Sequence, residues 1–305
     1  MLKISIISCS FYVIYSNLKQ NPALHFKQTL TILFPNSFTT FIWLALICLF
    51  SVFNWGLEIF KWKTLAKTIK ATSFTTAAKE VLSSHTTALF TPNRIGEYGA
   101  KALFYFSKER AKIMTLNAIG NLNQMAVTIC FGSIGLLYFI SQFPIELNFI
   151  SSPTNLFFIG ILGVGFFFLM FKYPQFYKGF TVKLKTHLNS LSSNLLLKIF
   201  GISALRYFVF STQFYLVLQW FQVEISYIHY ITTISSMYLL ASILPGLLIF
   251  DVVLKGGIAV YLFSFYHVSD ATILSTTFIL WIFNTVFPCL IGAVFVLNYK
   301  LPETT

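Results

Sequence analysis

The chain contains the sequence Thr-Pro-Asn-Arg-Ile-Gly-Glu-Tyr-Gly-Ala-Lys from Thr91 to Lys101. This stretch places three charged side chains and a proline inside a region that is otherwise apolar. A second cluster, Leu-Pro-Gly-Leu-Leu-Ile-Phe-Asp-Val-Val-Leu-Lys, runs from Leu244 to Lys255, and both clusters have an acid four residues before a lysine. A charge at membrane depth costs about 2.5–3.5 kcal/mol on insertion scales, so such residues usually face a polar interior. The two clusters therefore predict where a ligand or an ion binds.

The composition is typical of a membrane protein with several spans. Of the 305 residues, 56% are hydrophobic and 10% are charged, and the mean hydropathy is +0.75. Soluble domains carry about 25% charged residues. We therefore expect an all-α polytopic membrane protein that forms a single transmembrane domain over residues 1–305.

Six apolar segments are candidates for complete membrane spans, which need about 20 residues. The first of them resembles a signal peptide, but its apolar core begins too early, and we expect it to be retained as a helix. The six segments are Ile4–Leu18, Phe38–Phe60, Ile113–Ile140, Leu156–Phe171, Ile199–Phe221 and Thr272–Asn298.

Two further apolar stretches, Glu80–Phe106 and Tyr230–Tyr266, contain the charged clusters. The first has 27 residues, which is too short for two crossings, so both stretches are expected to form re-entrant helical hairpins. The order span, span, hairpin, span then occurs twice, in residues 1–140 and 154–300, starting from opposite sides of the membrane. This order predicts an inverted repeat with the substrate site between its halves. The alternative is eight complete spans, with Tyr230–Tyr266 crossing twice.

The distribution of lysine and arginine predicts the orientation, because cytoplasmic loops retain an excess of these residues. Basic residues are frequent between the second and third spans, whereas the segment Ser141–Pro153 has none. We expect both termini in the cytoplasm and the protein in a bacterial-type inner (plasma) membrane. The connection after the second span contains Lys61, Lys63, Lys67, Lys70 and Lys79.

The pair Thr91-Pro92 predicts a helix start, because threonine caps free amides and proline fits the first helical position. The exposed N–H groups of such a start bind anions, and an adjacent arginine can grip a phosphate through two hydrogen bonds. Arg94 is therefore the candidate phosphate ligand. Additional positive charge is expected from Lys101 and Lys255, balanced by Glu97 and Asp251. The alternative is that each acid only neutralises the lysine one helical turn away.

Three polar residues within the spans complete the candidate site. Arg206 lies about two turns inside its span, where it either faces the cavity or extends towards the inner headgroups. Asn121 and Gln124 lie one turn apart on one helix face and are expected to support the site or to bond between helices. His85 is expected to be a polar residue at the membrane interface.

Around Ala88–Phe104 the chain resembles the lysylphosphatidylglycerol synthase transmembrane region, also described as the flippase-like domain family. The resemblance extends over nearly the full length and is strongest at Pro92, Arg94, Gly96 and Glu97. A looser match follows at Pro245, Asp251, Lys255 and Gly256. Members of the family often have a glycine-rich turn with glutamate or arginine where this chain has Asp251 and Lys255.

The resemblance implies a membrane protein that moves an anionic or aminoacylated phospholipid, or another lipid-linked substrate, between leaflets. Family members that synthesise aminoacylated lipids carry a soluble transfer domain after the membrane part, and this chain ends at Thr305. We therefore expect no enzymatic activity from the chain itself, no cofactor and no metal. The alternatives are a membrane subunit of a lipid-modifying enzyme and a non-transporting membrane scaffold.

The expected partners are phospholipid headgroups, the membrane and a separately encoded soluble enzyme, with no nucleic acid. The expected substrate-binding residues are Pro92, Arg94, Gly96, Glu97, Lys101, Arg206, Asp251 and Lys255, supported by Asn121 and Gln124.

Overall fold

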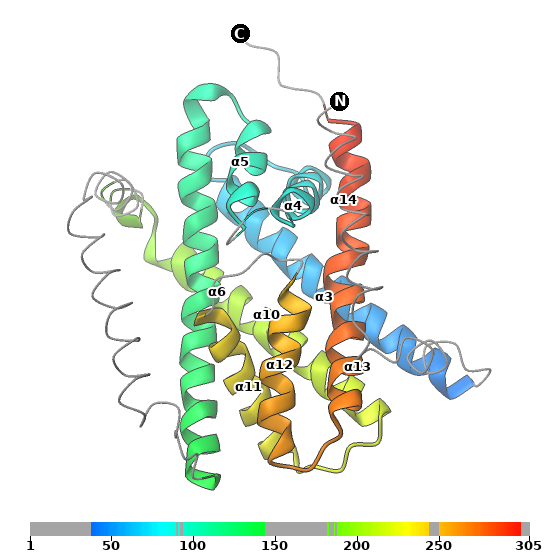
Figure 1. Ribbon diagram of the computed structural model, residues 1–305. Coiled ribbons are helices and arrows are strands. Elements are labelled where there is room, and N and C mark those ends of the chain that lie inside the picture. The colour runs from blue at the N-terminus through cyan, green and yellow to red at the C-terminus, as the bar shows by residue number, and fades with distance from the viewer. Residues whose placement is uncertain are drawn as a thin grey trace, which may run out of the picture.

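The computed structural model describes residues 38–89, 91, 94–143, 182, 186, 188–243 and 250–299. Every regular element within these ranges is a helix (Figure 1). The expected spans Ile4–Leu18 and Leu156–Phe171 lie outside the described residues, as do Pro92 and Pro245. The all-helical class is thus confirmed for the part of the chain that the structure describes.

Within the described residues, four helical runs are long and apolar enough to cross a membrane, which makes this a membrane-embedded protein. The first three are α3 (Phe38–Ala66), α6 (Ser107–Gln142) and α10 (Ser193–Trp220). The fourth run, Asp270–Leu297, consists of α13 (Asp270–Trp281), a π-helical turn η2 (Ile282–Val286) and α14 (Phe287–Leu297).

Helix α3 ends later than the sequence predicts. It continues past the expected boundary at Phe60 to Ala66, and Lys61, which we expected in the cytoplasmic connection, is 2% exposed inside the fold. The reason is an ion pair of 2.7 Å between Lys61 Nζ and Glu58, one turn earlier on the same helix. A paired lysine can stay within the helix because its charge is compensated.

Two pairs of shorter helices lie between the long ones. The first pair is α4 (Phe74–Ala88) with α5 (Ile95–Leu103), and the second is α11 (Tyr227–Ile243) with α12 (Asp251–Ser264). The longest of these has 17 residues, fewer than the 20 or so that a complete crossing needs. Each pair carries one of the two charged clusters.

The outer ends of the two helix pairs, where the chain enters and leaves each pair, lie at opposite ends of α6 (Figure 1). At the start of α6, Arg110 Nε donates a hydrogen bond of 3.2 Å to the carbonyl of Tyr105, just after α5. At its other end, the ring of Phe143 contacts that of Tyr266, just after α12, with centroids 5.0 Å apart. The 36 residues of α6 correspond to about 54 Å, so the pairs approach each other from the two ends of the molecule.

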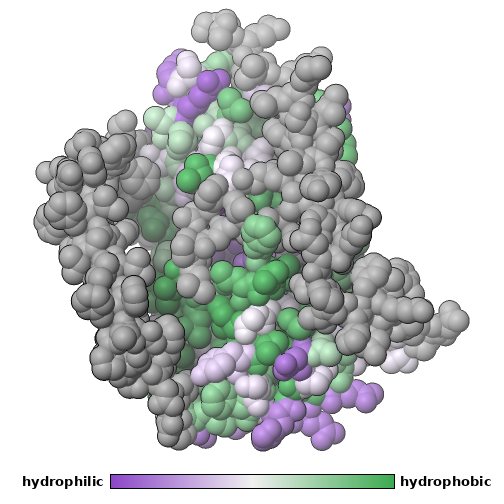
Figure 2. All heavy atoms as spheres, in the orientation of Figure 1, coloured by the Kyte–Doolittle hydropathy of each residue, from purple (hydrophilic) through white to green (hydrophobic). Residues whose placement is uncertain are grey.

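The apolar core is divided into two clusters along this axis. One cluster surrounds the first helix pair and includes Trp62, Leu116 and Ile199. The other surrounds the second pair and includes Phe139, Phe214 and Phe263. Figure 2 shows hydrophobic side chains across the middle of the visible described surface and hydrophilic ones near its upper and lower ends. This distribution fits a surface that faces lipid in its central band.

Candidate functional site

A cavity of about 570 Å³ lies between the two apolar clusters. Its walls come from both helix pairs and from all four long helical runs, and they include Arg94 of α5 and Asp251 of α12. Gln124, another wall residue, is at the centre of the 36-residue helix α6. The cavity is therefore about midway along the longest helix, and both charged clusters predicted from the sequence reach it.

The first helix of the site begins later than we predicted. We expected Pro92 at the first helical position, but α5 begins at Ile95, three residues further on. Arg94 precedes the helix with a left-handed backbone, φ 59°, a conformation that interrupts an α-helix. Arg94 is the N-cap residue and forms no side-chain capping bond, but Thr91 Oγ1 accepts a hydrogen bond of 2.7 Å from the Gly96 amide in the first turn of α5.

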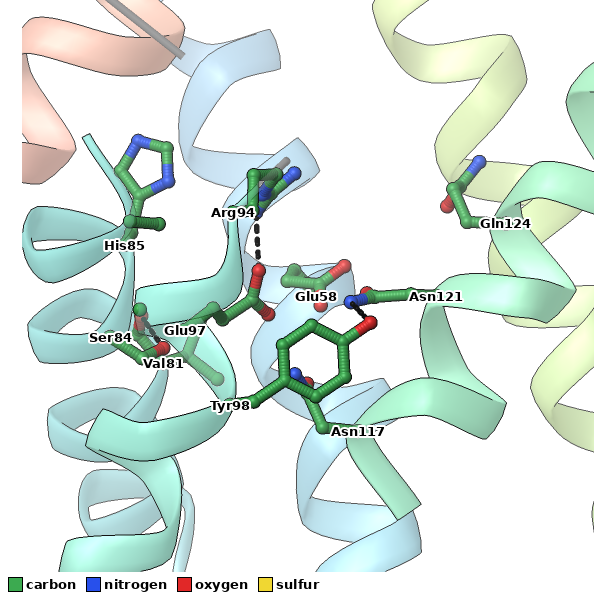
Figure 3. A network of polar contacts seen from close by, with 12 residues as sticks. Glu58, Val81, Ser84, His85, Arg94, Glu97, Tyr98, Asn117, Asn121 and Gln124 are labelled. Carbon is green, nitrogen blue, oxygen red and sulfur yellow. Dashed lines mark hydrogen bonds and ion pairs between the residues drawn. The ribbon is translucent and has the colours of Figure 1, made fainter. Parts of the chain in front are cut away.

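Glu97 is held between two cations at the start of α5. Its carboxylate lies 3.0 Å from Arg94 Nη2 and 2.8 Å from Lys101 Nζ. Figure 3 shows Arg94 and Glu97 pointing towards each other, with Glu58 and the bonded pair Tyr98 and Asn121 beside them.

The two cations that share Glu97 differ in accessibility. The side chain of Arg94 is 39% exposed and lines the cavity, whereas that of Lys101 is 1% exposed and does not. Lys101 Nζ also donates to Asn117 at 2.7 Å and lies 4.5 Å from the Trp62 ring centre. Arg94 can therefore contact a ligand, and Lys101 acts on the cavity only through its charge.

Gly96 allows the two helices of the first pair to approach each other closely. A Cβ atom at this position would lie 2.6 Å from the carbonyl oxygen of Thr87 in α4, closer than packed atoms tolerate. Gly96 is not on the cavity wall. Its contribution to the site is to let α5 lie against α4, which positions Arg94 and Glu97.

A second shared carboxylate, Glu58 of α3, was missed by the sequence analysis. It pairs with Lys61 at 2.7 Å and with Arg206 of α10 at 2.8 Å. The signal was present as an acid within an apolar span and a lysine three residues later, but Lys61 was assigned to a loop. Of the two alternatives for Arg206, the structure shows the cavity: its side chain is 14% exposed and lines the wall.

The second charged cluster forms an ion pair in which both side chains are partly exposed. Lys255 Nζ lies 2.7 Å from Asp251 on α12, and their side chains are 33% and 28% exposed. Lys255 Nζ is also 5.5 Å from the ring centre of Tyr238 in α11. Both charged residues line the cavity, so this pair faces the same space as Arg94.

Asn121 and Gln124 both line the cavity and bond to other helices. Asn121 Nδ2 donates to the hydroxyl of Tyr98 at 3.3 Å, and Gln124 Oε1 accepts from Arg206 at 3.4 Å. Gln124 also donates to the carbonyl of Ser203. Asn121 and Gln124 therefore both support the site and bond between helices, so the two alternatives hold together.

The π-helical turn η2 presents Asn284 to two neighbouring helices, α3 and α10. Its Oδ1 accepts a hydrogen bond of 3.0 Å from Asn54 of α3, and its Nδ2 donates to Gln213 of α10 at 2.8 Å. Asn54 in turn accepts a bond of 2.9 Å from Arg206 Nε. Single π turns are frequent at functional sites, and this one connects the wall of the cavity to the Glu58 pair.

We expected His85 to lie at the membrane interface, but it lies inside the fold. It is 4% exposed, lines the cavity and packs against Trp55 with ring centroids 4.5 Å apart. The edge contact with an indole ring explains how an imidazole is accommodated there.

Comparison of the chain with protein-family models, curated proteins and solved structures gave no match. The functional argument therefore rests on the geometry of the cavity and on the sequence motifs.

Proposed function

We propose that this protein binds the anionic headgroup of a lipid in the central cavity and moves the lipid between the leaflets of a membrane. The observation that carries this proposal is that Arg94, Arg206 and Lys255 all line one cavity at mid-length of α6. Cationic side chains at such depth usually mark a substrate path. A cavity of about 570 Å³ is also in the usual range for small-ligand sites.

The helix pairs support a transport function. They approach from opposite ends, neither contains a helix of 20 residues, and each brings a charged cluster to the cavity. Broken helices that meet near mid-membrane form the substrate sites of many secondary transporters built as inverted repeats. We therefore assign the pairs as re-entrant hairpins of the expected inverted repeat, with six complete spans in the whole chain.

The basic residues at the described ends of the helices support the proposed orientation. Lys67, Lys70 and Lys108 lie at the end where the first pair opens. The connections at the other end, residues 221–226 and 265–269, contain no lysine or arginine. Positive residues favour the cytoplasmic side, which makes the first end cytoplasmic. The resemblance to the flippase-like domain family agrees with a lipid substrate in a bacterial-type inner membrane.

The test is transbilayer movement of a fluorescent anionic phospholipid in proteoliposomes containing the full chain. Arg94→Ala is expected to abolish the movement, because the most accessible arginine of the cavity is removed. Arg110→Ala is the matched control, since Arg110, at the start of α6, bonds to the Tyr105 carbonyl and does not line the cavity. Movement at the wild-type rate in a folded Arg94→Ala variant would contradict the proposal.

A further inference from the structure

The ionic groups around the cavity are not balanced in number. Glu58 is shared by Lys61 and Arg206, and Glu97 is shared by Arg94 and Lys101. Only Asp251 has a single cationic partner, Lys255. We call these eight residues the central charge cluster. Its five cations and three carboxylates leave two positive charges without a carboxylate.

Glu80 is not a member of the central charge cluster and does not line the cavity. It lies in α4, outside the four spanning runs, and its carboxylate accepts hydrogen bonds from the neutral groups Trp62 Nε1 and Tyr105 OH. It forms no ion pair with any residue in the described ranges. Burial raises the pKa of the Glu80 carboxyl, and the hydrogen bonds from Trp62 and Tyr105 and the charge of Lys101 oppose this shift.

The cations of the cluster divide into those that can touch a ligand and those that cannot. Lys61 and Lys101 are 2% and 1% exposed and are absent from the cavity wall. Arg94, Lys255 and Arg206 line it, with side chains 39%, 33% and 14% exposed. The buried lysines share Glu58 and Glu97 with the two wall arginines. Neither arginine therefore has a carboxylate to itself, and both can bind a further anion, whereas Lys255 is paired with Asp251.

Resting on the proposed function, we infer that the preferred headgroup carries two negative charges, as in a phosphomonoester or diphosphate lipid. A phosphodiester headgroup supplies one negative charge and would leave one cation of the cluster uncompensated. A phosphomonoester has a second pKa near 6 and approaches two negative charges above it. Arginine binds such planar or tetrahedral oxyanions through parallel hydrogen bonds, and lysine adds a point charge.

The experiment measures binding to the full chain in nanodiscs of a zwitterionic lipid at about pH 7.5, where a phosphomonoester is mostly doubly charged. The probes are phosphatidic acid, phosphatidylglycerol with the same acyl chains, and inorganic phosphate. We expect phosphatidic acid to bind at least about tenfold more tightly than phosphatidylglycerol, a modest effect for one unit charge at an effective dielectric near 20. Inorganic phosphate should compete weakly, because it lacks the acyl chains.

Two variants each lower the excess charge by one. Lys101→Met leaves Glu97 paired with Arg94, and Lys255→Met changes a partly exposed position that is less critical for folding. Both should reduce the preference for phosphatidic acid about tenfold, by the same electrostatic argument. Lys198→Met is the matched control, since Lys198 lies 5.4 Å from the Phe60 ring and is not on the cavity wall.

The outcomes separate this inference from the proposed function. Equal binding of the two lipids, with Arg94→Ala abolishing both, overturns the inference about headgroup charge and leaves lipid transport standing. Binding of neither lipid overturns both. Binding of inorganic phosphate as tight as that of phosphatidic acid supports a doubly charged phosphate ligand but overturns its assignment to a lipid.

Discussion

Glu58 of α3 and Arg206 of α10 form an ion pair of 2.8 Å across 148 positions of the chain. Each belongs to a different half of the expected repeat, so this contact joins the two halves at the level of the cavity. Glu58 simultaneously holds Lys61. Its loss should therefore affect stability more than the loss of either partner.

Glu58→Gln is expected to destabilise the protein by about 3–5 kcal/mol, because it leaves Lys61 and Arg206 without their carboxylate. Arg206→Gln should cost less, since Glu58 keeps Lys61. Thermal unfolding of the purified variants in detergent measures the difference. Asp251→Asn is the control, because its ion pair is partly exposed. A melting temperature for Glu58→Gln equal to that of Arg206→Gln would show that Glu58 does not act as a shared partner.

Gly96→Ala is expected to destabilise the first helix pair by about 1–3 kcal/mol, the usual range for overpacking. The added Cβ would lie 2.6 Å from the Thr87 carbonyl oxygen and 2.8 Å from Thr91 Oγ1. Gly99→Ala on the same helix meets nothing within 4 Å and should be neutral or slightly stabilising, because alanine favours helix. Thermal unfolding compares the two, and equal effects would argue against close contact between α4 and α5.

Asn284→Ala is expected to cost about 1–3 kcal/mol, because it removes bonding partners from Asn54 and Gln213 within the fold. Asn298→Ala is the matched control: its side chain is exposed and bonds only to the Val294 carbonyl of its own helix. The same unfolding measurement applies. If both asparagine variants unfold at one temperature, the polar contacts of the π turn contribute nothing to stability.

Because the outer ends of the two helix pairs lie at opposite ends of the molecule, we expect residues there to be accessible from opposite sides of the membrane. In a background without the native cysteines, Ala71→Cys before α4 and Glu224→Cys before α11 place single thiols at these ends. A membrane-impermeant maleimide added to intact cells should label the position at 224 and leave that at 71 unlabelled. After the cells are permeabilised, both should react. Labelling of both thiols in intact cells would contradict the assigned hairpins.

Much of the architecture follows from the sequence because its signals are strong and local. Long apolar segments predict α3, α6, α10 and the run Asp270–Leu297, and proline with adjacent charges predicts the two interrupted stretches. Helix ends are harder to predict, since they depend on which side chains pair within the fold. Pairing with Glu58 keeps Lys61 inside α3, which a positive charge alone does not predict.

The candidate site was predictable where its residues are close in sequence. Glu97 with Lys101 and Asp251 with Lys255 are separated by one helical turn, and both pairs form. The link between Glu58 and Arg206 depends on tertiary packing of α3 against α10, for which periodicity gives no register. The left-handed backbone of Arg94 was equally hidden, because that conformation is uncommon for any residue with a side chain.

The position of the cationic excess at mid-length of α6 has an electrical consequence. A unit charge that crosses a whole membrane potential changes in energy by about 2.3 kcal/mol per 100 mV. Two unbalanced charges about halfway across the voltage drop would together gain or lose roughly the same amount. Any movement of these two charges along the membrane normal would thus be sensitive to voltage, whereas the same movement with a doubly charged anion in the cavity would not.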